Sequence, residues 1–171
     1  MMERFHIQFV GLKPGKHTYQ YLIENDFFEK RDYSIIRKAR VEVEVILDKQ
    51  DYSMKFDFHM KGMITLPCDR CNEELDLPVE DDRKLIVKLA GEDFEDNDEL
   101  VMLPRNESEI DLSQYIYEFI NLLLPLRVVH GNDAKGVSKC DKDVLAKLAA
   151  HSIGEPQTDT RWDILKKINL Q

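Results

Sequence analysis

Apolar and polar residues alternate along two neighbouring stretches in the first half of the chain. In VEVEVIL, residues 41–47, one face is apolar and the other carries Glu42 and Glu44. In MKFDFHMK, residues 54–61, the Met and Phe side chains share one face, and those of Lys, Asp and His59 share the other. We expect His59 to be exposed to solvent. A period of two is typical of half-buried antiparallel strands, and the short DKQDY segment between them predicts a hairpin.

Weaker patterns extend this sheet on both sides. Residues 75–79 alternate again and residues 84–89 form an apolar run, so residues 41–89 are predicted to be a meander. We expect further short strands at residues 3–10 and 100–103. Between the first of these and the meander, Thr18 as an N-cap and the apolar residues Tyr19, Leu22 and Ile23 predict a short helix.

Helical spacing replaces alternation after residue 110. Apolar residues recur every three or four positions along residues 112–123, with Asp111 as the N-cap, Gln114 in its first turn and Pro125 at its end. Residues 141–151 predict a second helix, residues 152–159 a linker and residues 160–168 a last short helix. We therefore expect an α+β fold, an antiparallel β-meander or partly open barrel packed by C-terminal helices. Residues 1–150 would form a single domain, and residues 151–171 a linker and short helix.

Composition places the chain among ordinary globular proteins. It has 171 residues, of which 43% are hydrophobic, which is enough for a core. Its apolar runs are shorter than a membrane span, and its first residues lack the apolar stretch of a secretory signal. The 3 cysteines argue against a secreted disulfide framework. We expect a cytoplasmic protein with no membrane partner.

The charge balance bears on the kind of partner. The net charge of −9 repels phosphate and favours a basic protein partner over naked nucleic acid. The acidic stretch GEDFEDNDEL, residues 91–100, reads as a solvated connection and lacks the spacing of a calcium loop. Basic clusters at residues 37–40 and 161–167 keep direct RNA binding open as an alternative.

Two cysteines carry the clearest candidate chemistry. Cys68 and Cys71, in CDRC, lie between two alternating segments, and thiolates at this spacing can supply half of a tetrahedral zinc site. His130 and Cys140, in a later loop with two glycines, would complete the set. Asp133 and Asp141, in the same region, are weaker candidate ligands that would bind the metal through a carboxylate oxygen. Such a zinc ion would be structural, since four protein ligands leave no open position for a substrate.

Other interpretations of Cys68 and Cys71 remain open. A redox pair normally begins a helix, whereas these cysteines precede a predicted strand with acidic neighbours that disfavour a thiolate. Hydrolysis by a Cys–His pair needs an orienting group that the sequence does not reveal. The pair can also be two reduced cysteines at a tight turn. The sequence has no Gly-rich phosphate loop, Ser elbow or HExxH motif, so we do not expect an enzyme.

The order of these motifs resembles the bacterial YceD family, the large ribosomal RNA subunit accumulation proteins. The shared signals are a Gly62-led strand into CDRC, IDL opening a helix that ends in LLLPL, VVH before a cysteine, and a closing DTRWDILKKI. Where this last motif commonly has Pro, the chain has Thr160.

The resemblance implies a non-enzymatic role in ribosome biogenesis, supporting accumulation of large-subunit ribosomal RNA. Genes of the family often lie beside that of a small basic ribosomal protein, which suggests a ribosomal protein or pre-ribosomal particle as partner and indirect contact with ribosomal RNA. The family pattern also pairs the Cys-x-x-Cys motif with the later His and Cys, and so implies Cys68, Cys71, His130 and Cys140 as metal ligands.

Overall fold

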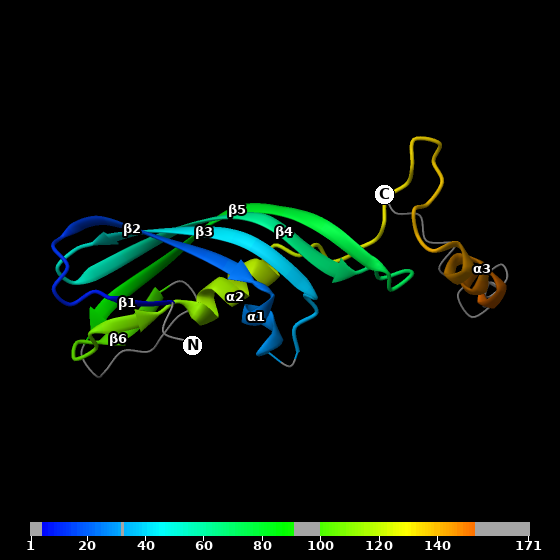
Figure 1. Ribbon diagram of the computed structural model, residues 1–171. Coiled ribbons are helices and arrows are strands. Elements are labelled where there is room, and N and C mark those ends of the chain that lie inside the picture. Colours follow the sequence, from blue (N-terminus) through cyan, green and yellow to red (C-terminus); the bar gives the residue numbers. More distant parts are fainter. Residues whose placement is uncertain (1–4, 32, 91–99, 153–171) are drawn as a thin grey trace, which may run out of the picture.

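The computed structural model describes residues 5–31, 33–90 and 100–152, which build one long curved sheet (Figure 1). The sheet has five strands in the order β2-β3-β4-β5-β6. Their bounds are β2 Gly15–Glu24, β3 Lys38–Lys49, β4 Ser53–Pro67, β5 Glu74–Ala90 and β6 Leu100–Pro104. Pairing is antiparallel from β2 to β5, whereas β6 runs parallel to β5.

A second, two-stranded sheet and three helices complete the described structure. Strand β1 (His6–Gln8) pairs with β7 (Glu109–Asp111). The helices are α1 (Asn25–Glu29), α2 (Ser113–Leu122) and α3 (Lys142–His151). No helix in the described part of the chain is long and apolar enough to cross a membrane.

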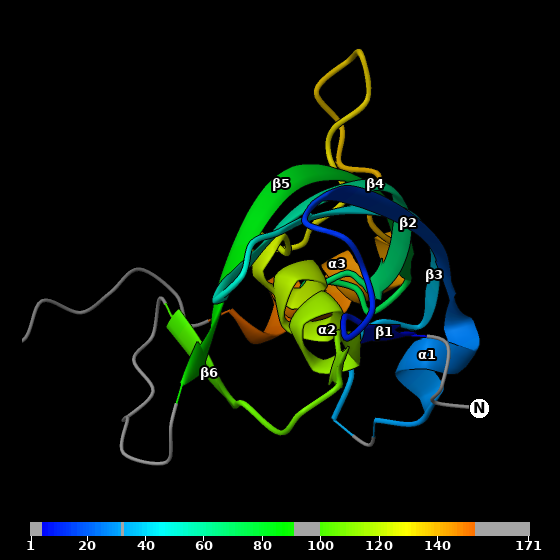
Figure 2. The same ribbon diagram turned by 90° about the vertical axis from the view of Figure 1, so that its left-hand side faces the viewer.

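The core lies between the concave face of the sheet and α2. The apolar residues that alternate along β3 and β4 are fully buried, and α2 lies inside the curve of the sheet (Figure 2). Helix α2 buries Ile116 and Ile120, and the ring of Phe119 contacts that of Phe58 with centroids 5.1 Å apart. The structure therefore confirms the predicted α+β fold, with an open sheet rather than a closed barrel.

The start of α2 differs slightly from its prediction. Leu112 occupies the cap position, while the Asp111 carboxylate accepts the Ser113 backbone N–H at 2.8 Å. Gln114 donates to Glu118 at 2.7 Å and does not reach back to the cap. The helix ends before Pro125, as expected.

The predicted helix at residues 18–23 is wrong, because this segment belongs to β2. Tyr19, Tyr21 and Ile23 alternate toward the core, and β2 pairs with β3 along ten residue pairs, from Gly15↔Lys49 to Glu24↔Arg40. This long hydrogen-bonded ladder outweighs the local helical signal. The two strands expected at residues 75–79 and 84–89 are one continuous strand, β5.

The C-terminal helices occupy different places. Helix α3, capped by Asp141, lies beyond one end of the sheet and has no buried residue (Figure 1). Its Val144 and Leu145 instead pack against a small cluster of buried cysteines. Our predictions for the acidic segment 91–99 and for residues 153–171 lie outside the described residues.

Candidate metal centre

The turn between β4 and β5 positions Cys68 and Cys71. The Cys68 N–H donates to the Glu73 carbonyl and the Asn72 N–H donates to the Cys68 carbonyl, both at 2.8 Å. Asn72 closes the turn at φ 63°, a left-handed conformation that Asn tolerates better than most residues. The two cysteines are 2% and 5% exposed, so both thiols are buried beneath this turn.

The loop after α2 docks directly onto this turn. The Asp69 N–H donates to the Val128 carbonyl at 2.7 Å, and the Val128 N–H donates to the Asp69 carboxylate at 2.6 Å. This places His130 beside Cys71, with Nδ1 3.4 Å from Sγ. Its Nε2 lies 3.1 Å from the Glu74 carbonyl, which can accept only from a protonated Nε2. In the neutral ring Nδ1 is then the free acceptor and faces the thiols.

The structure brings together all four residues that the sequence singled out. One ligand atom from each of Cys68, Cys71, His130 and Cys140 lies within 4.8 Å of the other three. Cys68 Sγ and Cys140 Sγ are 3.8 Å apart, far beyond the disulfide bond length of about 2.05 Å, and the three cysteines are free. Zn–S bonds of about 2.3 Å and Zn–N bonds of about 2.0 Å would place tetrahedral ligand atoms roughly 3.5–3.8 Å apart. The separations of 3.8 Å between Cys68 and Cys140 and of 3.4 Å between Cys71 and His130 are close to these values, and three thiols with one imidazole are a donor set that suits zinc.

Hydrogen bonds within the cluster favour a thiolate at Cys68. Burial raises the pKa of the Cys68 thiol, but backbone hydrogen bonds from Arg70, Cys71 and His130 outweigh it and lower the pKa from 9.0 to about 6. Burial lowers the pKa of His130, but its hydrogen bonds with Cys68 and the Glu74 carbonyl raise it overall. Acidic residues neighbour this turn, but the hydrogen bonds decide the direction of the shift in the pKa of Cys68. A thiolate near neutral pH is the form that binds zinc.

The two aspartates named as weaker ligands have other roles. Asp141 Oδ1 accepts the Val144 N–H at 2.8 Å and caps α3. Asp133 Oδ1 accepts the N–H groups of Lys135 and Val137, each at 2.8 Å. Sequence reasoning missed Asp69 as the residue that positions the loop, because an aspartate between two cysteines gives no signal of a partner 59 residues away.

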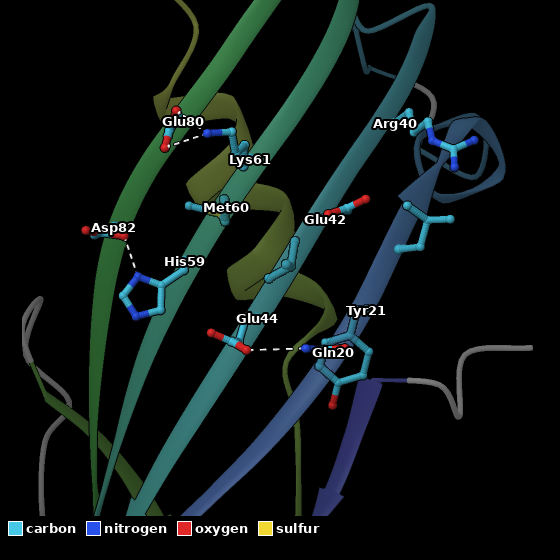
Figure 3. Close-up of a pocket in the computed structure, with 12 residues that line it drawn as sticks. Gln20, Tyr21, Arg40, Glu42, Glu44, His59, Met60, Lys61, Glu80 and Asp82 are labelled. Carbon is cyan, nitrogen blue, oxygen red and sulfur yellow. Dashed lines mark hydrogen bonds and ion pairs between the residues drawn. The ribbon is translucent and has the colours of Figure 1, made fainter.

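A second candidate surface is a groove of about 630 Å³ on the outer face of the sheet (Figure 3). Glu42 and Glu44 line it from β3, and Glu80 and Asp82 line it from β5. Between them on β4, Lys61 pairs with Glu80 at 3.0 Å, and His59, exposed as predicted, pairs with Asp82. The remaining lining includes Gln20, which donates to Glu44 at 3.3 Å. Because strand register sets these neighbours, alternation alone could not reveal the groove.

The comparisons with known proteins give one match. The family model described as large ribosomal RNA subunit accumulation protein YceD matches residues 56–169. This range covers well over half of the chain and includes both cysteines of CDRC, His130 and Cys140. Neither the comparison with curated proteins nor that with solved structures gave a match. The chain therefore belongs to the YceD family of large ribosomal RNA subunit accumulation proteins.

Proposed function

We propose that this protein is a non-enzymatic factor in biogenesis of the large ribosomal subunit, acting in the cytoplasm to support accumulation of large-subunit ribosomal RNA. The observation that carries the proposal is the family match, whose range includes the whole cysteine–histidine cluster. Binding fits the cluster better than catalysis does, because four protein ligands would leave a metal ion no open position.

The cluster is proposed to hold one structural zinc ion, with Cys68, Cys71, His130 and Cys140 as ligands. A bound zinc ion would join the β4–β5 turn to both ends of the segment between residues 130 and 140, and would thereby stabilise the fold. A redox role for Cys68 and Cys71 has weaker support. The pair is followed by β5 and not by a helix, and both thiols are buried.

The proposed partner is a basic ribosomal protein or a pre-ribosomal particle. Six of the nine residues 91–99 are Asp or Glu, and four carboxylates line the outer groove. With a net charge of −9, the chain would attract a Lys- or Arg-rich partner at long range, which would raise the rate of association. Contact with ribosomal RNA would then be indirect.

A deletion strain tests the proposed function. We expect the ratio of large- to small-subunit ribosomal RNA to fall without the protein and to recover with the wild-type chain. An unchanged ratio in the deletion strain would contradict the proposal.

One substitution separates structural zinc from thiol chemistry. Cys71→His exchanges a thiolate for another zinc ligand, so a structural site keeps its metal and the ribosomal RNA ratio recovers. Loss of complementation by a Cys71→His protein that still carries zinc would instead favour the thiol enzyme. Cys71→Ala, which supplies no ligand, is the matched control.

A further inference from the structure

One border of the main sheet is a long strand edge with which no other described strand pairs. Strand β2 is the last strand of the sheet on this side and pairs only with β3 (Figure 1). It runs for 10 residues in unbroken register with β3, without a bulge or a proline. An open edge of this kind is a template for pairing with another strand, and proteins usually protect such edges.

The other border of the sheet is protected. Strand β6 has only 5 residues and ends at Pro104, which has no N–H to donate. Strand β2 has neither feature, and the side chains that it packs against the core, those of Tyr19, Tyr21 and Ile23, are uncharged. The length and regularity of β2 therefore favour pairing with a further strand.

The hydrogen-bond pattern of the sheet identifies the backbone groups at the free edge of β2. The Gln50 N–H donates to the Ser53 carbonyl at 2.8 Å, so even-numbered residues of β3 direct their N–H and C=O groups toward β4. Odd-numbered residues of β3 direct theirs toward β2, where each pairs with an odd-numbered residue. Ala39 is consistent with this pattern, because its N–H donates to the Asn25 side chain just beyond the end of β2. The residues of β2 that direct backbone groups to the free edge are therefore Lys16, Thr18, Gln20, Leu22 and Glu24.

A second copy of the chain fits this edge in one register. Two β2 strands related by a two-fold axis at Gln20 place Lys16 of one copy opposite Glu24 of the other, at both ends of the pairing. Both side chains are exposed. Residues directly opposite each other in an antiparallel pair share a face, and opposite charges there stabilise the pair. Moving the axis by one residue in either direction removes both Lys–Glu pairs.

The charges on the neighbouring strand are also complementary. Within one chain, Glu24 lies opposite Arg40 of β3, and Lys16 lies opposite Asp48. Across the two-fold axis, the outer face would carry a row of four alternating charges: Arg40 and Glu24 of one copy, then Lys16 and Asp48 of the other. Between the two ends of the pairing the facing residues of β2 are uncharged, so no like charges lie directly opposite each other.

We propose that the protein forms a homodimer through antiparallel pairing of two β2 edges, which joins the two main sheets into one. The outward-directed backbone groups of each β2 would then form hydrogen bonds with the other copy. On the concave face, Tyr19 of one copy would lie opposite Tyr21 of the other and add aromatic contact. The two outer grooves, each lined by Gln20 and Leu22, would lie next to each other. The inference does not depend on the proposed function.

Sedimentation equilibrium of the full chain over a series of concentrations tests the dimer. The probe variants are Lys16→Glu and Glu24→Lys, each of which places like charges opposite each other at both ends of the pairing. We expect each variant alone to raise the dimer dissociation constant at least about tenfold. An equimolar mixture of the two should form a heterodimer, because every such pair then again joins a Lys with a Glu.

The control variants for these charge changes are Lys84→Glu and Glu107→Lys, at exposed positions outside β2. They change the net charge by the same amounts as the probe variants. The dissociation constant of each control should stay within about twofold of the wild-type value.

A substitution at Thr18 tests the backbone pairing. The Thr18 N–H is directed to the free edge, so Thr18→Pro removes a donor from the dimer contact and none from the β2–β3 ladder. Thr18→Val keeps this N–H and is the matched control. We expect the Pro variant to be monomeric and the Val variant to dimerise, with the fold of each checked by circular dichroism. If the Pro variant does not fold, the charge variants decide.

Three outcomes overturn the inference. The first is a wild-type chain that sediments as a monomer at every concentration. The second is a dimer that Lys16→Glu and Glu24→Lys leave as stable as that of the wild type, since it would then use another surface. The third is a mixture of these two variants that stays monomeric.

Discussion

Asp69 and Val128 hold each other through two hydrogen bonds that join the two parts of the candidate metal centre. The Asp69 N–H donates to the Val128 carbonyl at 2.7 Å, and the Val128 N–H donates to the Asp69 carboxylate at 2.6 Å. Asp69 lies within CDRC and Val128 lies two residues before His130. Protein contacts therefore set the approach of the later loop and hold the four candidate ligands close together.

Removing the Asp69 carboxylate should weaken zinc binding. In Asp69→Ala the buried Val128 N–H loses its acceptor, at a cost of about 1–3 kcal/mol, and His130 is held less firmly. Loss of such a supporting contact typically lowers metal affinity about 10- to 100-fold. Competition with a chromophoric chelator measures this change. Glu73→Gln, in the same turn, keeps the carbonyl that accepts the Cys68 N–H and should match the wild type. Equal affinities of Asp69→Ala and the wild type would show that the contact does not position the ligand.

In the metal-free protein, the thiol of Cys68 should ionise at an unusually low pH. Hydrogen bonds lower the pKa of Cys68 to about 6, so its thiolate forms above that pH and disappears as the pH falls through it. Because protons compete with the metal for its ligands, zinc affinity should fall as the pH is lowered, and bound zinc should shift protonation of Cys68 to a pH below that of the metal-free protein. Thiolate absorbance near 240 nm follows the titration, and Cys68→Ser should remove the early step. A first thiol titration near the ordinary value of 9.0 would contradict this expectation.

Gly62 is required where β3 and β4 come close together. A Cβ at this position would lie 2.2 Å from the Arg40 carbonyl oxygen and 2.6 Å from the Val41 Cα, both backbone atoms. Gly62→Ala must push the strands apart, and we expect the free energy of unfolding to fall by about 1–3 kcal/mol or more. Chemical denaturation measures it. Gly131→Ala, where a Cβ meets nothing within 4 Å, is the control, and equal stability of the two variants would rule out the close contact.

Arg31 should stabilise the packing of α1 against α2. Its guanidinium lies 4.6 Å from the Phe27 ring centroid and 4.2 Å from that of Tyr117, and donates to the Ser113 carbonyl at 3.3 Å. Arg31→Lys keeps the charge but loses the planar group, so we expect a loss of about 1–2 kcal/mol in the free energy of unfolding. Arg105→Lys, at an exposed position, should be nearly neutral. Unchanged thermal unfolding of Arg31→Lys would show that the stacking contributes little.

The sequence predicts best those elements whose pattern depends on residues close together in the chain. Strict alternation predicted β3 and β4, because burial of one face dictates it. The helix assigned to residues 18–23 was wrong, because short apolar spacing is ambiguous and only pairing with β3 decides it. The parallel pairing of β6 and the outer groove depend on register between distant strands, which composition does not encode.

The same limit applies to the candidate metal centre. Residue type and loop position were enough to name the four side chains that converge, although metal binding itself stays a prediction. The contacts that organise them come from backbone groups, such as the Glu74 carbonyl beside His130 and the N–H groups around Cys68. Backbone groups are nearly the same in every residue, so the sequence does not show which of them will form hydrogen bonds with His130 or Cys68.

The most direct test is the metal content of the full chain, purified without chelators and measured by mass spectrometry under native conditions and after denaturation. We expect about one zinc ion per folded chain. It should be lost in Cys71→Ser and His130→Ala and retained in Cys71→His. A wild-type chain that is folded, reduced and free of metal even after incubation with zinc would contradict the proposed centre, and Cys68, Cys71 and Cys140 would then be reduced thiols packed at the end of the sheet.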